Sequence, residues 1–370
     1  MLISGMTIDW RTRGFVQPEP VTAEEFLAAR HRLFDGPFTW PLMVARESAL
    51  DHNVRVLADH VQKNGLLHAP HGKTTMSPQL FAKQLAAGAW GLTAATASQV
   101  MVYRNLGVER VLLANEIYDT RAIEWLARQD FAELLVYADS PRGVELLAGK
   151  GFRVLVELGH PGGRTGCRTA DEAKALKALV DATDGVEFAG VSGYEGTQPD
   201  RDGVRAYLKG LRRLAEELDA PIVSAGGSSY FDLVTDELAG MDARVIVRPG
   251  AYIGHDEGFY ARMSPFADRL RPALEVYAQV LSTPEPGLAI VGLGKRDVPH
   301  DLDLPIAPDG LTVTGLQDQH TYLSDPGGLV RPGDVLRFGI SHPCTAFDKW
   351  RVIPVVDDDH IVVDLLTTYF

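Results

Sequence analysis

Cysteine, long apolar runs and net positive charge are scarce or missing in this chain of 370 residues. Two cysteines are too few for a disulfide framework, and such sparing use fits a reducing compartment. No stretch approaches the ~18 apolar residues of a membrane span, and the first 15 residues lack the apolar core of a signal peptide. We therefore expect a cytoplasmic protein. The formal charge of -13 argues against nucleic acid and anionic membranes as partners.

From residue 66 onward, eight short apolar runs alternate with amphipathic segments that carry helix signals. Ser77 and Pro78, for example, have the pattern of an N-cap and a first helical residue. Eight strand-helix units predict an α/β fold of the (β/α)8, TIM-like barrel type. An open doubly wound sheet is the alternative, but it usually has fewer strands. The predicted strands are 66–71, 91–96, 110–114, 134–138, 153–158, 187–191, 221–225 and 244–247.

After about residue 271 the pattern changes, because strand-like runs follow one another without helical segments between them. These runs, at 273–280, 288–292, 311–315, 334–340 and 351–356, predict a second, mainly antiparallel β domain. Residues 1–40 are rich in proline and glycine, and we expect them to wrap onto that domain. The predicted domains are therefore 41–270 for the barrel, and 1–40 plus 271–370 for the β domain.

The segment 71–75, His-Gly-Lys-Thr-Thr, directly follows the first predicted barrel strand. It imitates a P-loop, but a P-loop needs glycine six residues before the lysine, where this chain has Leu67. Barrel enzymes place their chemistry at the carboxyl ends of the strands, and burial there lowers a lysine's pKa so that its free amine can attack an aldehyde. A solvated loop lysine is the simpler interpretation, but the position after the first strand favours a cofactor-binding role for Lys73.

Glycine-rich turns follow the seventh and eighth predicted strands, with Ala-Gly-Gly-Ser-Ser at 225–229 and Arg-Pro-Gly-Ala-Tyr at 248–252. Loops after these two strands form the usual phosphate site of barrels, where backbone N–H groups close on the anion. Arg164 and Tyr194 follow the fifth and sixth strands. Arginine there suits a phenolate oxygen and tyrosine a pyridine nitrogen, although a surface arginine and a packing tyrosine are equally common.

The second chemical motif is Ser-His-Pro-Cys at 341–344. In an extended chain, a spacing of two puts the imidazole of His342 and the thiolate of Cys344 on one face, where both can bind a borderline metal such as zinc. Structural zinc normally takes four protein ligands, whereas a catalytic metal leaves positions open. An isolated His-x-Cys pair is more often coincidence than a ligand pair. Cys167 has no partner motif and is interpreted as a small core residue.

Taken together, these motifs resemble the alanine racemase fold type of pyridoxal phosphate (PLP) enzymes. More narrowly, the chain is similar to the family of D-serine dehydratases and D-threonine aldolases. The resemblance runs over nearly the whole chain, although each motif is short. Two positions depart from the family pattern, since Gly72 stands where alanine is typical and Thr75 where histidine is frequent. The matching segments are 41–44, 71–74, 84–89, 112–116, 193–196 and 341–344.

The resemblance implies that Lys73 binds PLP as a Schiff base and removes the substrate α-proton. It implies Tyr194 near the pyridine nitrogen and Arg164 near the ring oxygen. It also implies a divalent metal on His342 and Cys344, with zinc favoured over manganese, a D-amino acid as substrate, and a homodimer. The residues that the resemblance places around the cofactor phosphate are Gly226, Gly227, Ser228, Gly250, Ala251 and Tyr252.

The predicted activity is a PLP- and metal-dependent lyase acting on D-3-hydroxy amino acids. The cysteine of the His-x-Cys pair resembles the zinc-dependent dehydratases, which release a 2-oxo acid and ammonia, whereas the aldolases usually carry His-x-Asp. Retro-aldol cleavage to glycine and an aldehyde is the first alternative. A PLP-binding protein without turnover is the second, although such proteins are single barrels. A barrel metalloenzyme without PLP is the third, and it would be colourless.

Overall fold

The computed structural model describes residues 5–370 and divides into two compact units. Of the described residues, one unit contains those up to Val56, the short segment Thr74–Lys83 and everything from Ala251 to Phe370. The other contains Leu57–Lys73 and Gln84–Gly250. Among the described residues, no helix is both long and apolar enough to cross a membrane.

The second unit is built on an eight-stranded parallel sheet, which confirms the eight strands predicted for the barrel. Its strand order is β4-β11-β10-β9-β8-β7-β6-β5, and an isolated parallel bridge between His71 and Thr93 joins the first edge to the last. The sheet therefore curls back on itself. The strands are β4 (Leu67–His68), β5 (Leu92–Ala94), β6 (Arg110–Leu113), β7 (Glu133–Ala138), β8 (Phe152–Leu158), β9 (Val186–Gly193), β10 (Ile222–Ser224) and β11 (Arg244–Val247).

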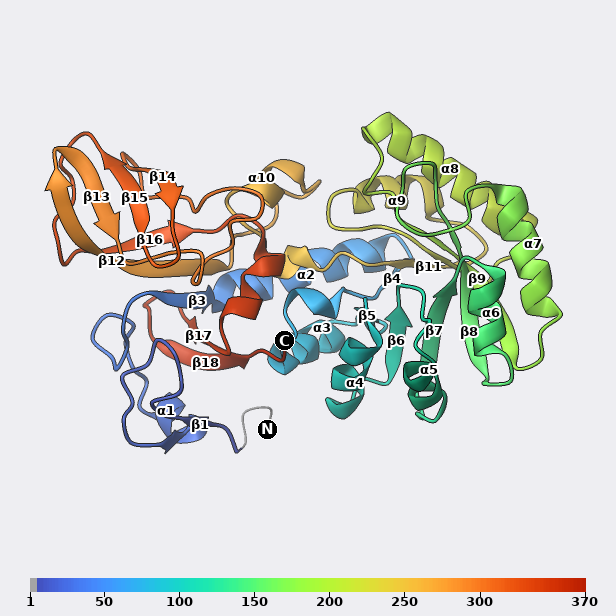
Figure 1. Ribbon diagram of the computed structural model, residues 1–370, viewed down its shortest axis with the longest axis horizontal. Coiled ribbons are helices and arrows are strands. Elements are labelled where there is room, and N and C mark those ends of the chain that lie inside the picture. Colours follow the sequence, from blue (N-terminus) through green and yellow to red (C-terminus); the bar gives the residue numbers. More distant parts are fainter. Residues whose placement is uncertain (1–4) are drawn as a thin grey trace. The chain divides into compact units, whose positions relative to one another are not determined.

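Apolar side chains from successive strands fill the inside of this sheet. They form one buried cluster: Ala69, Leu112, Leu135, Tyr137, Leu155, Ala189, Ile222 and Ile246. Helices lie around the outside of the sheet (Figure 1), and most begin at a side-chain cap that accepts a backbone N–H bond. These helices are α4 (Ala97–Asn105), α5 (Thr120–Ala127), α6 (Pro141–Leu147), α7 (Ala170–Asp181), α8 (Arg201–Glu217) and α9 (Phe231–Leu238). Two more, α2 (Glu47–Lys63) and α3 (Pro78–Ala86), each cross from one unit into the other.

The other unit contains a mainly antiparallel sheet of order β14-β15-β13-β12-β3-β17-β18, with β16 paired to β12 (Figure 1). The β3–β17 pair is parallel. The sequence did not predict β15, which contains three polar residues in five, or β18. The strands are β3 (Leu42–Arg46), β12 (Leu274–Glu285), β13 (Gly287–Val291), β14 (Thr312–Leu316), β15 (Thr321–Asp325), β16 (Val335–Gly339), β17 (Val352–Val356) and β18 (Val362–Thr367).

Strand β3 corrects one predicted boundary, because a barrel beginning at residue 41 includes it and the structure places it in the antiparallel sheet. It lies between β12 and β17, and its first four residues are buried. An apolar strand of this kind needs neighbours on both edges and cover on both faces. The centre of this sheet supplies both.

The N-terminal segment contains a two-stranded ribbon, β1 (Thr7–Ile8) with β2 (Val21–Thr22), and helix α1 (Ala23–Ala28). Thr22 caps α1 in a capping box with Glu25. Arg13 then lies over the Trp350 ring at 4.2 Å, and Arg32 pairs with Ile361 through an isolated bridge. The remaining short elements of this unit are η2 (Ala251–Ile253), α10 (Phe259–Met263), η3 (Pro343–Thr345) and η4 (Phe347–Lys349).

Candidate active site

The predicted cofactor residues in the barrel unit all follow the carboxyl ends of its strands. Lys73 lies in η1 (Gly72–Thr74) after β4, Arg164 follows β8 and Tyr194 follows β9. Gly226, Gly227 and Ser228 follow β10, and Gly250 follows β11. Because parallel strands end at the same edge, the structure brings these residues to one end of the sheet. Ala251, Tyr252, His342 and Cys344 belong to the other unit.

Lys73 is exposed, which differs from the burial that the sequence led us to expect. The pKa of His71, two residues earlier in the chain, shows which charged groups act on this end of the barrel. Burial of the ring holds the pKa of His71 well below its usual value, and the positive charges of Lys73, Arg248 and Arg164 lower it further. The Nδ1 atom of His71 is shielded from solvent and has no hydrogen-bond partner within residues 5–370. Three cations therefore act on this end of the barrel, which suits an anionic ligand.

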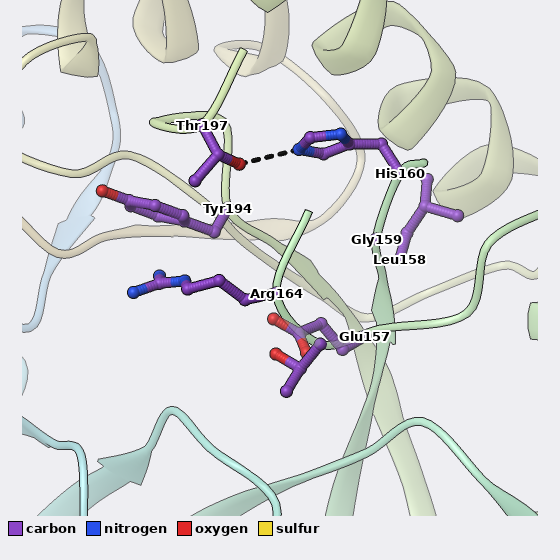
Figure 2. A pocket seen from close by; sticks show the side chains of 8 residues that line it. Glu157, Leu158, Gly159, His160, Arg164, Tyr194 and Thr197 are labelled. Atoms are coloured by element: carbon purple, nitrogen blue, oxygen red, sulfur yellow. Dashed lines mark hydrogen bonds between the residues drawn. The ribbon is translucent and has the colours of Figure 1, made fainter. Parts of the chain in front are cut away.

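Arg164 and Tyr194 lie against each other, with the guanidinium carbon 4.1 Å from the centre of the tyrosine ring (Figure 2). Both line a small cavity whose wall also includes Glu157, His160 and Thr197. A hydrogen bond of 2.7 Å between His160 Nε2 and Thr197 Oγ1 ties the loop after β8 to the loop after β9 (Figure 2). The two predicted ring-binding side chains therefore share one cavity.

The glycine turn after β10 differs from the prediction in one respect. The amides of Gly226 and Gly227 already donate to the buried carboxylate of Glu195, at 3.0 and 2.7 Å. They are therefore not aimed at an external anion. Gly227 leaves space beside Tyr194, because a Cβ at this position would lie 3.2 Å from the tyrosine ring. Gly226 has a positive φ of 93°, which glycine adopts without strain. The Gly250 amide donates to Ser228 Oγ at 3.3 Å, so both predicted phosphate turns are linked.

Arg248 is a site residue that the sequence analysis did not single out. It is 4% exposed, and its guanidinium donates to Ser224 Oγ at 2.7 Å and to the carbonyl of Gly193 at 2.9 Å. Its Nε has no partner among the described residues. One feature of the sequence could have indicated this role. Arg248 stands at the end of an apolar strand, directly before the proline and glycine of a predicted phosphate turn.

A pair of carboxyl groups lies in the same part of the barrel. Burial, together with the neighbouring carboxylates of Glu157 and Asp139, raises the pKa of Glu116 to about 9. No N–H or hydroxyl group of the described residues donates to either Glu116 oxygen. Glu116 is therefore protonated near neutral pH, and its carboxyl proton can be donated to Glu157.

In the β unit, His342 and Cys344 do not lie on an extended strand, which corrects the predicted geometry. His342 has left-handed backbone angles, with φ 75° and ψ 85°, and η3 begins at the next residue. The turn still brings the two side chains within hydrogen-bonding range of each other. Although burial by itself lowers the pKa of His342, its interactions with Cys344 and Asp301 raise it to about 9. The same negative field favours a bound cation.

Three residues that the sequence analysis missed hold this pair. Asp301 Oδ2 lies 2.6 Å from His342 Nδ1, and its other oxygen accepts a hydrogen bond from Thr345. Buried Asp256 accepts the backbone N–H of His342 at 2.9 Å and so fixes its unusual conformation. Thr74 Oγ1 lies 3.6 Å from Cys344 Sγ. No sequence pattern marks Asp301 or Asp256, because they are 41 and 86 residues away along the chain.

The Asp301 contact leaves Nε2 as the ring nitrogen of His342 that can bind a metal. Among the described residues, no group of three or more histidine, cysteine or acidic side chains is arranged to hold an ion. The pair therefore offers two protein ligands and open positions, as in a catalytic metal site.

Two family models and several known proteins match this chain. The family model of the alanine racemase N-terminal domain matches residues 46–255, and that of a putative serine dehydratase domain matches residues 273–356. D-threonine aldolase of Arthrobacter sp. is 26% identical over 345 residues, which are 86% of this chain and 89% of that protein. D-threo-3-hydroxyaspartate dehydratase of Delftia sp. (strain HT23) is 26% identical over 354 residues, which are 85% of this chain and 89% of that protein.

The crystal structure of D-threonine aldolase from Filomicrobium marinum has a TM-score of 0.80 and 25% sequence identity. The match covers 90% of this chain and 95% of that one, so it includes both units. The alanine racemase N-terminal domain model spans more than half of the chain. The protein therefore belongs to the family of the alanine racemase N-terminal domain.

Proposed function

We propose that this protein is a PLP- and divalent metal-dependent lyase that dehydrates D-3-hydroxy amino acids to a 2-oxo acid and ammonia. The observation that carries the proposal is the contact between Thr74 and Cys344, 3.6 Å from Oγ1 to Sγ. Thr74 directly follows Lys73 in the chain, so the candidate metal ligand touches the residue next to the candidate cofactor lysine. Relatives that act on D-3-hydroxy amino acids by name support the substrate class.

The residues of the barrel unit fit PLP in charge and in space. Three cations act on His71, and the Nε of buried Arg248 has no partner in the described part of the chain, so a phosphate-bearing ligand meets positive charge there. The turn at Gly226 and Gly227 leaves space that a Cβ would fill. Lys73 would hold PLP, Arg164 and Tyr194 would contact its ring, and Ser228, Gly250, Ala251 and Tyr252 would surround its phosphate. When bound, PLP withdraws electrons from the substrate α-carbon.

Lys73 then has a second task, which is to accept the α-proton on its amine. Its exposure keeps the amine accessible to a substrate. Tyr194 offers a neutral hydroxyl rather than a cation to the ring, and we infer that this favours prompt loss of the β-substituent over racemisation. The loop tie between His160 and Thr197 keeps the cavity beside Arg164 narrow.

The β unit fits a divalent metal. A thiolate and an imidazole are the ligands that zinc prefers, and the orientation of His342 by Asp301 leaves Nε2 for it. Manganese prefers oxygen ligands, so zinc is the first choice. A metal held there would supply Lewis-acid chemistry to the β-hydroxyl and so assist its departure.

Retro-aldol cleavage is the second candidate, because the D-threonine aldolases of Arthrobacter and Filomicrobium marinum match this chain along most of its length. Product analysis separates the two activities. With D-serine and D-threonine as substrates, dehydration gives 2-oxo acids and ammonia, and cleavage of D-threonine gives glycine and acetaldehyde. Aldehyde and glycine as the main products would reject the dehydratase assignment.

Cofactor and metal dependence are tested on the same preparation. The protein should be yellow, Lys73→Ala should be colourless after PLP is added and dialysed away, and a chelator should remove activity from the wild type. Activity that survives chelation would take His342 and Cys344 out of the reaction.

We further propose that the protein is a cytoplasmic homodimer. A monomeric mass in analytical ultracentrifugation would contradict the dimer.

A further inference from the structure

Arg168, which lies just before the N-cap of α7, binds the loop that carries Arg164. Its Nη1 donates to the carbonyls of Thr165 and Gly166, at 2.9 and 3.0 Å. Its Nη2 donates to the carbonyls of Gly163 and Arg164, at 3.3 and 2.7 Å. Four successive backbone carbonyls therefore converge on one guanidinium, and the backbone on both sides of Arg164 is fixed by it.

The loop is shaped to admit this guanidinium. A Cβ on Gly159 would lie 2.3 Å from Arg168 Nη1 and 2.3 Å from the carbonyl oxygen of Thr165. Gly166 has a positive φ of 97°, and a Cβ there would meet the backbone of Gly159 at 2.4 Å. The loop can close around the Arg168 guanidinium because Gly159 and Gly166 have no side chains.

The ends of the loop are joined independently of Arg168. Gly159 N–H donates to the carbonyl of Cys167 at 2.8 Å, and Cys167 N–H donates to the carbonyl of Glu157 at 2.8 Å. Gly166 N–H donates to Asp139 at 3.0 Å. Removal of the Arg168 guanidinium should therefore loosen residues 163–166 without unfolding the base of the loop.

The Arg168 guanidinium binds these carbonyls and forms no ion pair with the described residues. Among residues 5–370, no carboxylate lies within ion-pair distance of its guanidinium, and Glu172 accepts its backbone N–H instead, at 2.7 Å. Hydrogen bonds from a charged guanidinium to carbonyls are stronger than bonds between neutral groups. The bonds of Arg168 are therefore suited to holding the loop in place.

The partner of Arg164 is fixed in a similar way. The backbone N–H of Tyr194 donates to the hydroxyl of Tyr207 at 3.1 Å, and that hydroxyl donates to the carbonyl of Leu158 at 2.6 Å. Tyr194 therefore presents its ring from a held backbone, and the 4.1 Å stacking of Arg164 on this ring depends on where the Arg164 loop lies.

We propose that Arg168 is a positioning residue for cofactor binding, acting through Arg164. It fixes the 163–166 backbone so that the Arg164 guanidinium is held beside Tyr194, ready for the ring oxygen of PLP. The inference rests on the proposed function, because it needs Arg164 to contact PLP.

The test is a double-mutant cycle on the full chain, with Arg164→Met, Arg168→Met and the double variant. The readouts are the Kd for PLP added to PLP-free protein, and amide hydrogen exchange in residues 160–167 without PLP. We expect each single variant to weaken PLP binding about tenfold, and the double variant to bind as Arg164→Met does, because both act through one contact. Arg168→Met should speed exchange in the loop, and Arg168→Lys should recover part of the affinity.

Arg213→Met is the matched control, because Arg213 lines the same outer cleft as Arg168 but projects from α8. It should change neither readout. Additive losses in the double variant, or unchanged exchange in Arg168→Met, would overturn the role of Arg168. If Arg164→Met binds PLP normally while Arg168→Met still speeds exchange, the failure lies in the proposed contact between Arg164 and PLP.

Discussion

Thr74 and Cys344, which are 270 residues apart in the chain, meet through a hydroxyl and a sulfur 3.6 Å apart. Thr74 is 1% exposed, so its hydroxyl has no access to bulk water. A hydroxyl that donates to a thiolate stabilises the form of cysteine that binds metals. Through this contact, the residue beside Lys73 also supports the candidate metal ligand.

Thr74→Val tests this contact, since valine keeps the shape of threonine and removes the hydroxyl. We expect the affinity for Zn²⁺ to fall about three- to tenfold, as for one lost hydrogen bond. Competition with a chromophoric chelator measures it. Thr75→Val is the matched control, because Thr75 is also buried and its hydroxyl has no hydrogen-bond partner from residue 5 onward. Equal losses in both variants would assign the effect to packing.

Asp301 holds the ring of His342, so Asp301→Ala should weaken zinc binding about 10- to 100-fold. Asp301→Asn keeps an acceptor for the Nδ1 proton and should lose less. Asp309→Ala, at an exposed residue nearby in the sequence, serves as the control. Isothermal titration with Zn²⁺ gives the three affinities, and wild-type binding by Asp301→Ala would remove Asp301 from the metal site.

Glu116 should make stability depend on pH. Its pKa is about 9 in the folded protein and about 4.5 when unfolded, so between these values the folded chain holds a proton that the unfolded chain releases. This contribution lowers the free energy of unfolding as pH rises through that window. Glu116→Gln keeps a donor for Glu157 without needing a proton, and should stabilise the protein by on the order of 1–3 kcal/mol at pH 8.

Urea unfolding at pH 5, 7 and 9 measures this effect, and the variant should gain most at pH 9. Glu109→Gln is the control, since Glu109 is exposed in the same unit. A gain of equal size at all three pH values would show that Glu116 is not the titrating group.

Cys344→Asp should change which bond is broken. A carboxylate is a harder ligand than a thiolate and can also accept the proton of the β-hydroxyl, which favours cleavage of the Cα–Cβ bond. With D-threonine as substrate, we expect the ratio of acetaldehyde to 2-oxobutanoate to rise about tenfold. Chromatography of both products after derivatisation gives the ratio. An unchanged ratio with zinc still bound would separate product choice from the ligand at this position.

The sequence by itself determined the barrel and the order of its site residues. Eight apolar runs at helix-sized intervals leave few ways to bury every strand, and parallel strands bring Lys73, Arg164 and Tyr194 to one end. Local rules also located the His342–Cys344 pair. They could not assign β3 to the right unit, because Leu42, Met43, Val44 and Ala45 form an apolar run that fits a barrel strand as well as a central antiparallel strand.

Only the tertiary structure decided how these residues are held. The amides of Gly226 and Gly227 are taken by Glu195, His342 is fixed by Asp256 and Asp301, and Arg168 binds the loop of Arg164. Strands and helices arise from short-range periodicity that a sequence displays directly. A side-chain hydrogen bond depends on where loops of different strands close, and that is set by the packing of the whole unit.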